Sequence, residues 1–168
     1  MVWGEVMALD IVLAYDRADE VRELFAEYMD MLLEGDPTFA GYLIIQNYDD
    51  ELKDLSHKYG LPDGRLYLAY WDGELAGSIA LRKIDDENCE LKRMYIKPQF
   101  RRKGIAKALV LRLIEDACGM GYRYMLLDTL PFLKTAIQMY QKIGFYEIGR
   151  YNDSPMDTSI YMKFDLGE

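Results

Sequence analysis

Four basic side chains and one glycine gather where an apolar-striped helix is predicted to begin. Arg101, Arg102 and Lys103 precede Gly104, and Lys107 follows it within one helical turn. The first turn of a helix exposes unpaired backbone N–H groups and carries about half a positive charge, so it attracts anions. Gly104 lacks a Cβ and lets the backbone approach a bulky anion. The segment predicts a phosphate site, although a solvated basic helix start is the alternative when the segment is taken alone.

Several other kinds of site are disfavoured by the residue types present. The chain has neither G-x-x-x-x-G-K-[ST] nor a G-x-G-x-x-G after a predicted strand, two common nucleotide-binding patterns. Its single histidine, His57, lies among polar neighbours near a predicted helix end, so we expect a surface residue there. Cys89 and Cys118 are too few for a metal cage or a disulfide framework, so we expect reduced thiols and no metal.

The overall composition indicates a folded, acidic protein. The 168 residues carry a formal net charge of -9, which opposes general binding to nucleic acid phosphates. No run reaches the roughly 18 apolar residues of a membrane helix, and no secretory signal is visible at the start. We therefore expect a cytoplasmic protein with no membrane partner. We expect one domain over residues 1–168, with 1–7 as a loose tail if Met7 is an alternative start.

Hydrophobic periodicity and turn signals predict the elements that must position the phosphate site. Asp16 and Asn47 are expected to cap the first two helices, and Asp72-Gly73 marks a hairpin turn. The expected strands cover 10–15, the two arms of 65–84, 89–98, 122–129, 145–151 and 158–166. The expected helices cover 17–32, 48–58, 103–119 and 131–143, with 35–42 as a loop. This order predicts a mixed α/β sheet with helices on its faces.

Two motifs after the strand at 89–98 give the chain a family resemblance. Residues 101–106 read R-x-x-G-x-A, and residues 136–145 read A-x-x-x-Y-x-x-x-G-F, with one predicted helix and one predicted strand between them. In these motifs, and in the order of elements from about 10 to 165, the chain resembles the GNAT superfamily of acyl-CoA-dependent N-acetyltransferases. The resemblance implies an α/β (α+β) GNAT fold with a mixed, mostly antiparallel sheet of about six or seven strands and about four flanking helices.

The resemblance also implies acetyl-CoA as the cosubstrate. The pantetheine arm is expected to hydrogen-bond the backbone of Met94, Tyr95 and Ile96, as an added strand would. Leu133 stands where many relatives have an asparagine that contacts this arm, and Lys134 is a candidate for the 3′-phosphate. The pyrophosphate is expected to lie against Arg101, Arg102, Lys103, Gly104, Ile105, Ala106 and Lys107.

Two side chains are candidates for proton transfer. The family tyrosine at the place of Tyr140 points its hydroxyl at the coenzyme sulfur and acts as general acid; a core tyrosine is the alternative. In some relatives a glutamate at the place of Glu90 acts as general base, often through water. The alternative is that Glu90 pairs with Lys92 across a strand face. Lys92 and Arg93 are otherwise expected to extend the positive field.

The expected reaction is direct attack by a primary amine of a small molecule or peptide on acetyl-CoA in a ternary complex. No cysteine or serine is evidently placed as a relay. Many family members form homodimers, so a homodimer is one expectation here. A non-catalytic acyl-CoA sensor or interaction module of the same fold is the main alternative, and nucleic-acid binding by residues 92–107 is a more distant one.

The first third of the chain suggests a charge preference for the acceptor. Residues 1–60 hold fourteen acidic and four basic side chains, a local balance of -10. In the family fold the first two helices and their connecting loop wall the acceptor side, so a negative funnel would attract a cationic amine. The alternative is that these carboxylates only keep the surface soluble. The acidic residues on or beside that loop are Asp30, Glu34, Asp36, Asp49 and Asp50.

Overall fold

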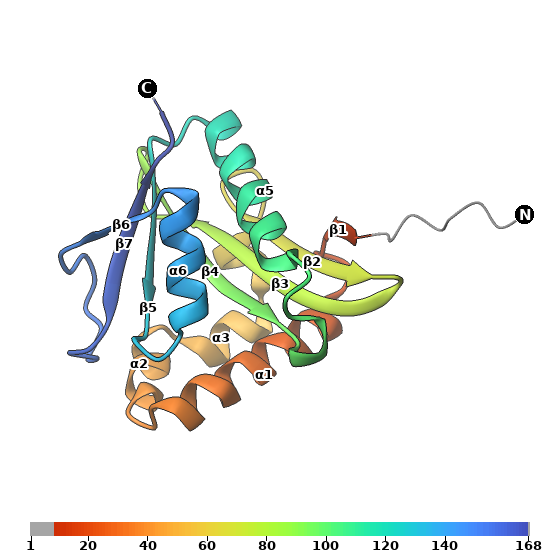
Figure 1. The fold of residues 1–168 in the computed structure, drawn as a ribbon, viewed down its shortest axis with the longest axis horizontal. Coiled ribbons are helices and arrows are strands. Elements are labelled where there is room, and N and C mark those ends of the chain that lie inside the picture. Colours follow the sequence, from red (N-terminus) through yellow and green to blue (C-terminus); the bar gives the residue numbers. More distant parts are fainter. Residues whose placement is uncertain (1–8, 168) are drawn as a thin grey trace, which may run out of the picture.

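Seven strands form one open sheet in the order β1-β2-β3-β4-β5-β7-β6 (Figure 1). The computed structural model describes residues 9–167, so the interpretation of 1–7 as a loose tail lies outside the described residues. Within 9–167 the elements are β1 (Leu9–Leu13), α1 (Ala18–Gly35), α2 (Phe39–Ile45), α3 (Tyr48–Lys53), α4 (Leu55–Tyr59), β2 (Arg65–Trp71), β3 (Glu74–Lys83), β4 (Asn88–Ile96), a 3-10 turn (Pro98–Phe100), α5 (Ile105–Met120), β5 (Tyr124–Thr129), α6 (Lys134–Ile143), β6 (Tyr146–Ile148) and β7 (Ile160–Asp165).

The pairing of β4 with β5 is the one parallel contact among the described strands, and it is short. It joins Asn88–Glu90 to Tyr124–Leu126, whereas every other neighbouring pair runs antiparallel. Beyond Glu90 the two strands diverge, as Figure 1 shows. The sheet is therefore split along its middle, and backbone groups on facing sides of β4 and β5 lack a strand partner there.

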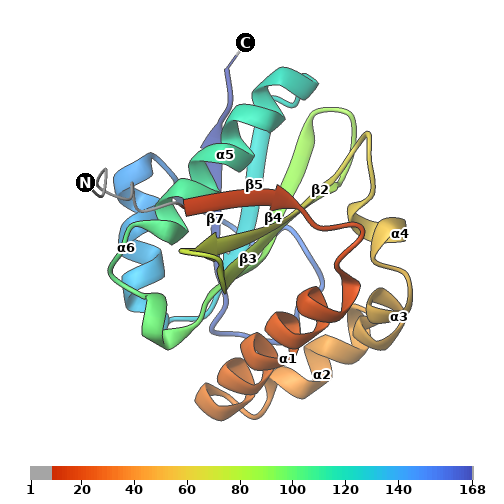
Figure 2. The same ribbon diagram turned by 90° about the vertical axis from the view of Figure 1, so that its right-hand side faces the viewer.

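Side chains of the sheet alternate between two helical layers. Leu66 and Leu68 of β2 pack with α1 and α4, whereas Tyr67 and Ala69 pack in the cluster that contains α5. This is the period of two expected of a strand that is covered on both faces. Figure 2 shows α5 and α6 on one side of the sheet and α1 to α4 on the other. The predicted mixed α/β sheet is confirmed.

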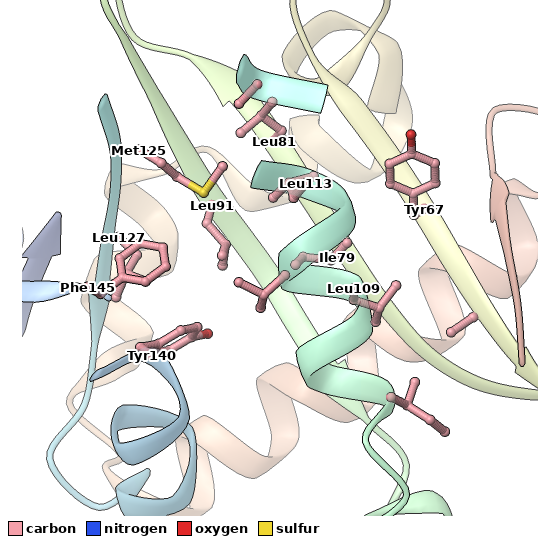
Figure 3. Close-up of a cluster of buried hydrophobic side chains, with 14 of the residues drawn as sticks. Tyr67, Ile79, Leu81, Leu91, Leu109, Leu113, Met125, Leu127, Tyr140 and Phe145 are labelled. Atoms are coloured by element: carbon pink, nitrogen blue, oxygen red, sulfur yellow. The ribbon is translucent and has the colours of Figure 1, made fainter. Parts of the chain in front are cut away.

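The hairpin and the central helix agree closely with the sequence patterns. Asp72 and Gly73 connect β2 to β3, and both have positive φ, 50° and 82°, as a two-residue turn between antiparallel strands requires. The predicted inner stripe of α5 is buried at Ile105, Leu109 and Leu113, which pack on β3 and β4 (Figure 3). Gly144 ends α6 at φ 130°, and helices at 103–119 and 131–143 are confirmed with bounds shifted by up to three residues.

The region between α1 and β2 differs from the prediction. The loop expected at 35–42 contains the last residue of α1 and the first turn of α2, which continues to Ile45. The helix expected at 48–58 is divided at Asp54 into α3 and α4. The chain therefore has more than the four helices expected. Helix α2 spans only seven residues and buries only Phe39 and Tyr42, too few positions for a periodic pattern to reveal.

The predicted caps were partly wrong. Arg17, not Asp16, precedes the first helical residue, and it makes no side-chain cap hydrogen bond. Asn47 does precede α3, but it has φ 54° and also makes no side-chain cap hydrogen bond. Among the described residues, no helix is both long enough and apolar enough to cross a bilayer.

Candidate functional site

A cleft of about 660 Å³ is lined by residues of α1, α2, β4, α5, β5 and α6, and it includes the place where the sheet splits. One part, here called the loop end, is lined by residues 101–107 except Lys103. The other, here called the polar end, is lined by Tyr42, Gln46, Lys92, Arg93 and Asp128. Along β4, Lys92 precedes Ile96 by four residues, about 13 Å of extended strand.

The loop end has the backbone geometry that a phosphate site needs. Gly104 has φ 78° at the N-terminus of α5, and Arg102 has φ 63°. A Cβ built on Gly104 would meet no atom within 4 Å, so positive φ and the approach of a ligand, rather than crowding by the protein, favour glycine here. Arg102 and Lys107 make no ion pair with any residue of 9–167 and line the cleft.

The two other basic residues of the loop are held by the protein. The Arg101 Nε donates to the carbonyl oxygen of Ile96 at 3.1 Å, and its guanidinium lies 5.8 Å from the Tyr95 ring centroid. The Lys103 ammonium lies over the Trp71 ring, 5.4 Å from its centroid, and Lys103 does not line the cleft. The structure thus brings Arg101, Arg102, Gly104, Ile105, Ala106 and Lys107 to one wall of the cleft and leaves Lys103 outside it.

A bulge in β4 separates the loop end from the polar end. The register with β3 shifts between Ser78 and Ala80, Arg93 has φ 57°, and Ser78 Oγ donates to the Arg93 carbonyl at 2.9 Å. Met94, Tyr95 and Ile96 follow the bulge and line the cleft. Because β5 no longer pairs with β4 there, this edge can accept an extended ligand as an added strand.

Tyr140 closes the cleft from α6. It is buried and lines the cleft, and its ring lies edge-on to Phe145 with centroids 5.5 Å apart. Figure 3 shows the hydroxyl pointing away from Phe145, toward the side of α5. Burial, with a smaller contribution from Tyr28, raises the pKa of this hydroxyl well above its ordinary value, so it stays protonated at neutral pH. Leu133 and Lys134 at the start of α6 also line the cleft.

Glu90 lies beside the cleft and is not among the residues that line it. Its side chain is 2% exposed, Oε1 accepts from Arg82 Nε at 2.6 Å, and Oε2 accepts from the Tyr151 hydroxyl at 2.5 Å. Lys92 Nζ is 3.9 Å from Oε1, so the predicted pairing with Lys92 exists as a long contact. Burial alone would raise the pKa of Glu90, but Lys92 and Arg82 outweigh it and lower the pKa.

Asp128 is a cleft carboxylate that sequence analysis missed. It lies near the end of β5, and its Oδ2 accepts from the Tyr42 hydroxyl and from Asn152 Nδ2, the latter at 2.9 Å. Asn152 Oδ1 in turn accepts from the Tyr161 hydroxyl at 3.1 Å. Oδ1 of Asp128 accepts no hydrogen bond within residues 9–167, so it is available to a ligand. The signal in the sequence that could have identified Asp128 was a lone carboxylate near the end of an otherwise apolar strand. No such signal existed for Tyr42, because its helix was not expected.

The acidic residues of the first third of the chain lie elsewhere. Asp30, Glu34, Asp36, Asp49 and Asp50 do not line the cleft. His57 is an exposed residue in the last turn of α4, as expected. Within the described part of the chain, no group of three or more His, Cys, Asp or Glu side chains is placed to hold a metal ion.

Comparisons with known proteins agree with this geometry. The model of the acetyltransferase (GNAT) family matches residues 18–145. An uncharacterized N-acetyltransferase of Dictyostelium discoideum is 32% identical to this chain in an alignment of 222 positions that covers 95% of this chain and 100% of that protein. The N-acetylaspartate synthetase of Danio rerio is 34% identical over 129 residues, which cover 73% of this chain and 46% of that protein.

A solved structure shares the whole fold. The PaiA N-acetyltransferase of Thermoplasma acidophilum, in complex with coenzyme A, aligns with a TM-score of 0.71 at 22% identity, covering 95% of this chain and 99% of that one. At 22% identity this similarity shows a shared fold only. The roles of individual residues in this chain therefore rest on the geometry of its own cleft.

Proposed function

This chain belongs to the acetyltransferase (GNAT) family and is an acyltransferase, and we propose that it transfers the acetyl group of acetyl-CoA to an amine held at the polar end of the cleft. The observation that carries the proposal is the continuity of one cleft, which joins the phosphate-type loop at Gly104, the open edge of β4, Tyr140 and Asp128. The N-acetylaspartate synthetase relative is named for an N-acetylated amine, which supports an amine as the acceptor.

The loop end and the β4 edge fit coenzyme A. The positive φ of Gly104 and the free cations of Arg102 and Lys107 suit the pyrophosphate. The unpaired backbone of Met94–Ile96 suits the amide groups of the pantetheine arm. Leu133 adds an apolar contact to this wall in place of an amide side chain, so this chain holds the arm chiefly through its backbone.

Tyr140 is the proposed proton donor. Acetyl transfer releases a thiolate, and a phenol kept protonated by burial can donate to that sulfur as the C–S bond breaks. The hydroxyl makes no hydrogen bond with residues 9–167, so it is free for this contact.

Asp128 is the proposed proton acceptor for the amine, in place of Glu90. A base must reach the proton that it removes, and Asp128 lines the cleft with one free oxygen. Glu90 does not line the cleft, both of its oxygens are occupied, and its lowered pKa makes it a weaker base. Glu90 instead balances the charge of Arg82, its close ionic partner.

Neither cysteine is suited to carry the acetyl group as an intermediate, which favours direct attack by the amine on the thioester. Neither Cys89 nor Cys118 lines the cleft. Burial raises the pKa of Cys89 to about 12, so its thiol is not a nucleophile at neutral pH.

Thiol release from acetyl-CoA tests the proposed function. The purified protein is incubated with acetyl-CoA and, separately, with amino acids, polyamines and peptides, and products are identified by mass spectrometry. We expect release of free thiol that depends on one class of amine, matched by N-acetyl product. Binding of acetyl-CoA without turnover on any amine would contradict the proposal and support an acyl-CoA sensor.

A further inference from the structure

One buried cation at the polar end of the cleft lacks a close carboxylate partner. Lys92 lines the cleft, and its side chain is only 6% exposed. A buried ammonium group loses its hydration, and it normally pairs with an anion and places its three N–H groups on acceptors. The neighbouring cations and carboxylates show whether the protein itself supplies an anion and three acceptors for Lys92.

Arg93, its neighbour on β4, has a close carboxylate partner. Its Nε and Nη2 donate to the two oxygens of Glu51 at 2.9 and 2.8 Å, and Nη2 also donates to Gln46 Oε1 at 2.8 Å. Lys58 Nζ donates to the same carboxylate at 2.8 Å. Glu51 therefore has two cations of its own and is not free to balance Lys92.

The other buried carboxylate, Glu90, is also occupied. Arg82 is its close ionic partner at 2.6 Å, and the Tyr151 hydroxyl holds its second oxygen. Lys92 Nζ lies 3.9 Å from Glu90, beyond hydrogen-bond distance. The four cations Lys58, Arg82, Lys92 and Arg93 thus share two carboxylates, Glu51 and Glu90.

Lys92 consequently holds the unused charge. Its Nζ makes one hydrogen bond, to Gln46 Oε1 at 2.9 Å, and two of its three N–H groups have no acceptor within residues 9–167. Burial lowers the pKa of Lys92, since the carboxylates around it offset the loss of hydration only in part. A ligand carboxylate placed in the cleft would complete both the charge balance and the hydrogen bonds.

Asp128 supplies the opposite charge on the other side of the split sheet. No ion pair joins it to Lys92 within 4.0 Å, although the charge of Asp128 favours the protonated form of Lys92 and so acts to raise its pKa. Counting Asp128 as a third carboxylate still leaves one positive charge in excess. The polar end is thus dipolar, with a cation on β4 and a carboxylate on β5. A molecule that carries both an amine and a carboxylate matches this pattern.

We propose that the acceptor is an amino acid or a similar amine that bears a carboxylate, with the carboxylate bound by Lys92 and the amine facing Asp128. This inference rests on the proposed function and names the acceptor class of the same cleft. This acceptor class differs from the cationic amine suggested by the acidic charge of residues 1–60. The reason is that Lys92 and Asp128 line the cleft, whereas the acidic residues on and beside the first loop do not.

Paired acceptors that differ only in the carboxylate test the inference. L-alanine, β-alanine and L-aspartate are compared with L-alaninamide, β-alaninamide and L-asparagine, and putrescine represents a cationic amine without a carboxylate. For at least one pair we expect kcat/KM to be higher for the acid by about 10- to 100-fold, the scale of a hydrogen bond to a charged group. Amine basicity cannot produce this preference for the α-amino acids, since α-amino amides lose their ammonium proton more readily.

Variants locate the preference at Lys92. Lys92→Met should abolish the preference for the acid, and Lys92→Gln, which keeps a polar partner for Gln46, should do the same if the methionine variant folds poorly. Retained thermal stabilisation by acetyl-CoA shows that each variant is folded. Lys53→Met is the control, because the Lys53 side chain is 78% exposed and does not line the cleft.

The outcomes separate the inference from the proposed function. Equal turnover of acids and amides, preferred acetylation of putrescine, or a preference that survives in Lys92→Met would each overturn the inference while leaving an acetyltransferase. Absence of N-acetyl product from every amine would overturn the proposed function, and the inference with it.

Discussion

At the scale of single residues, the cleft assigns different tasks to groups that look alike in the sequence. Glu90 and Asp128 are both carboxylates on neighbouring strands, but Glu90 is enclosed by Arg82 and Tyr151, whereas Asp128 lines the cleft and has one oxygen without a hydrogen bond to residues 9–167. Among 14 tyrosines, Tyr28 and Tyr140 line the cleft and make no side-chain hydrogen bond to residues 9–167, and of the two only Tyr140 is a buried residue, at 4% exposed. Contacts, rather than residue type, decide which group can transfer a proton.

Removing the Tyr140 hydroxyl should slow catalysis without weakening cofactor binding. Tyr140→Phe keeps the ring contact with Phe145 and removes the proton donor, so we expect kcat to fall about 10²-fold while the Kd for acetyl-CoA changes little. Steady-state kinetics and calorimetric titration measure the two quantities. Tyr146→Phe is the matched control, because Tyr146 is exposed and bonds only Asp165. Unchanged kcat in Tyr140→Phe would remove Tyr140 from the mechanism.

The identity of the base can be read from the pH dependence of two variants. Asp128→Asn should lower kcat/KM by about 10²-fold at neutral pH, and the loss should shrink at higher pH, where the acceptor amine deprotonates in solution. Glu90→Gln should show no such recovery, since Glu90 balances charge and does not line the cleft. The opposite result, with recovery in Glu90→Gln alone, would assign the base to Glu90.

At the scale of elements, the start of α5 and the bulge of β4 form the binding wall through backbone conformation. Gly104 and Arg102 both have positive φ, and Arg93 has positive φ at the bulge. These conformations are costly for most residues, and such costly backbone conformations cluster at binding sites.

Glycine variants at the two ends of α5 separate binding from folding. Gly104 and Gly121 have φ 78° and 90°, and neither would place a Cβ within 4 Å of another group. Valine at either position should cost on the order of 1–2 kcal/mol of stability through the left-handed backbone. Acetyl-CoA should raise the melting temperature of Gly121→Val but no longer that of Gly104→Val, as measured by differential scanning fluorimetry. Equal stabilisation of both variants would show that Gly104 is not at the phosphate site.

The elements themselves were largely predictable from the sequence, and the polar end was not. The Asp72-Gly73 turn, the stripe of α5 and Gly144 each act locally, so pattern and conformation agree. Arg101–Ala106 and Tyr140 could be proposed as site residues from the sequence, because each belongs to a motif that occupies one uninterrupted stretch of the chain. The polar end joins α2, β4 and β5 through Gln46, Lys92 and Asp128, which no local pattern connects. Similarly, only the packed structure separates Lys103 from its basic neighbours.

At the scale of the whole molecule, a split sheet carries a positive interior within an acidic protein. The chain has a net charge of -9, yet Lys92 and Arg93 are buried beside the split. Glu51, on α3, joins the helical layer of the first third of the chain to β4 through its ion pair with Arg93, and it also pairs with Lys58 of α4. This ion cluster fixes Arg93, a residue of the cleft wall, to the helical layer, so stability and the position of Arg93 depend on the same charges.

Acid sensitivity should reveal the contribution of this cluster. Burial alone would raise the pKa of Glu51, but Arg93 and Lys58 lower it to about 2. Because the folded pKa is below the unfolded one, the stability that Glu51 supplies is present above about pH 4.5 and is lost as the pH falls toward 2. Glu51→Gln should cost about 3 kcal/mol at neutral pH and should flatten the fall in stability between pH 4.5 and 2.

Urea unfolding across this pH range measures the effect. Glu34→Gln removes an exposed carboxylate of α1 and should leave the pH curve unchanged. A Glu51→Gln curve parallel to that of the unmodified protein would show that the Glu51 ion cluster does not set acid stability.

The central claim, that one cleft brings thioester and amine together for direct transfer, is tested most directly by following a labelled acetyl group. The protein is mixed in excess with acetyl-labelled acetyl-CoA, first alone and then with an accepted amine, and the label is located by mass spectrometry. We predict that the label stays on coenzyme A until the amine is added and then appears on the amine nitrogen, with one free thiol for each N-acetyl product. Label on the protein chain before the amine is added, or thiol release without an N-acetyl product, would contradict the account.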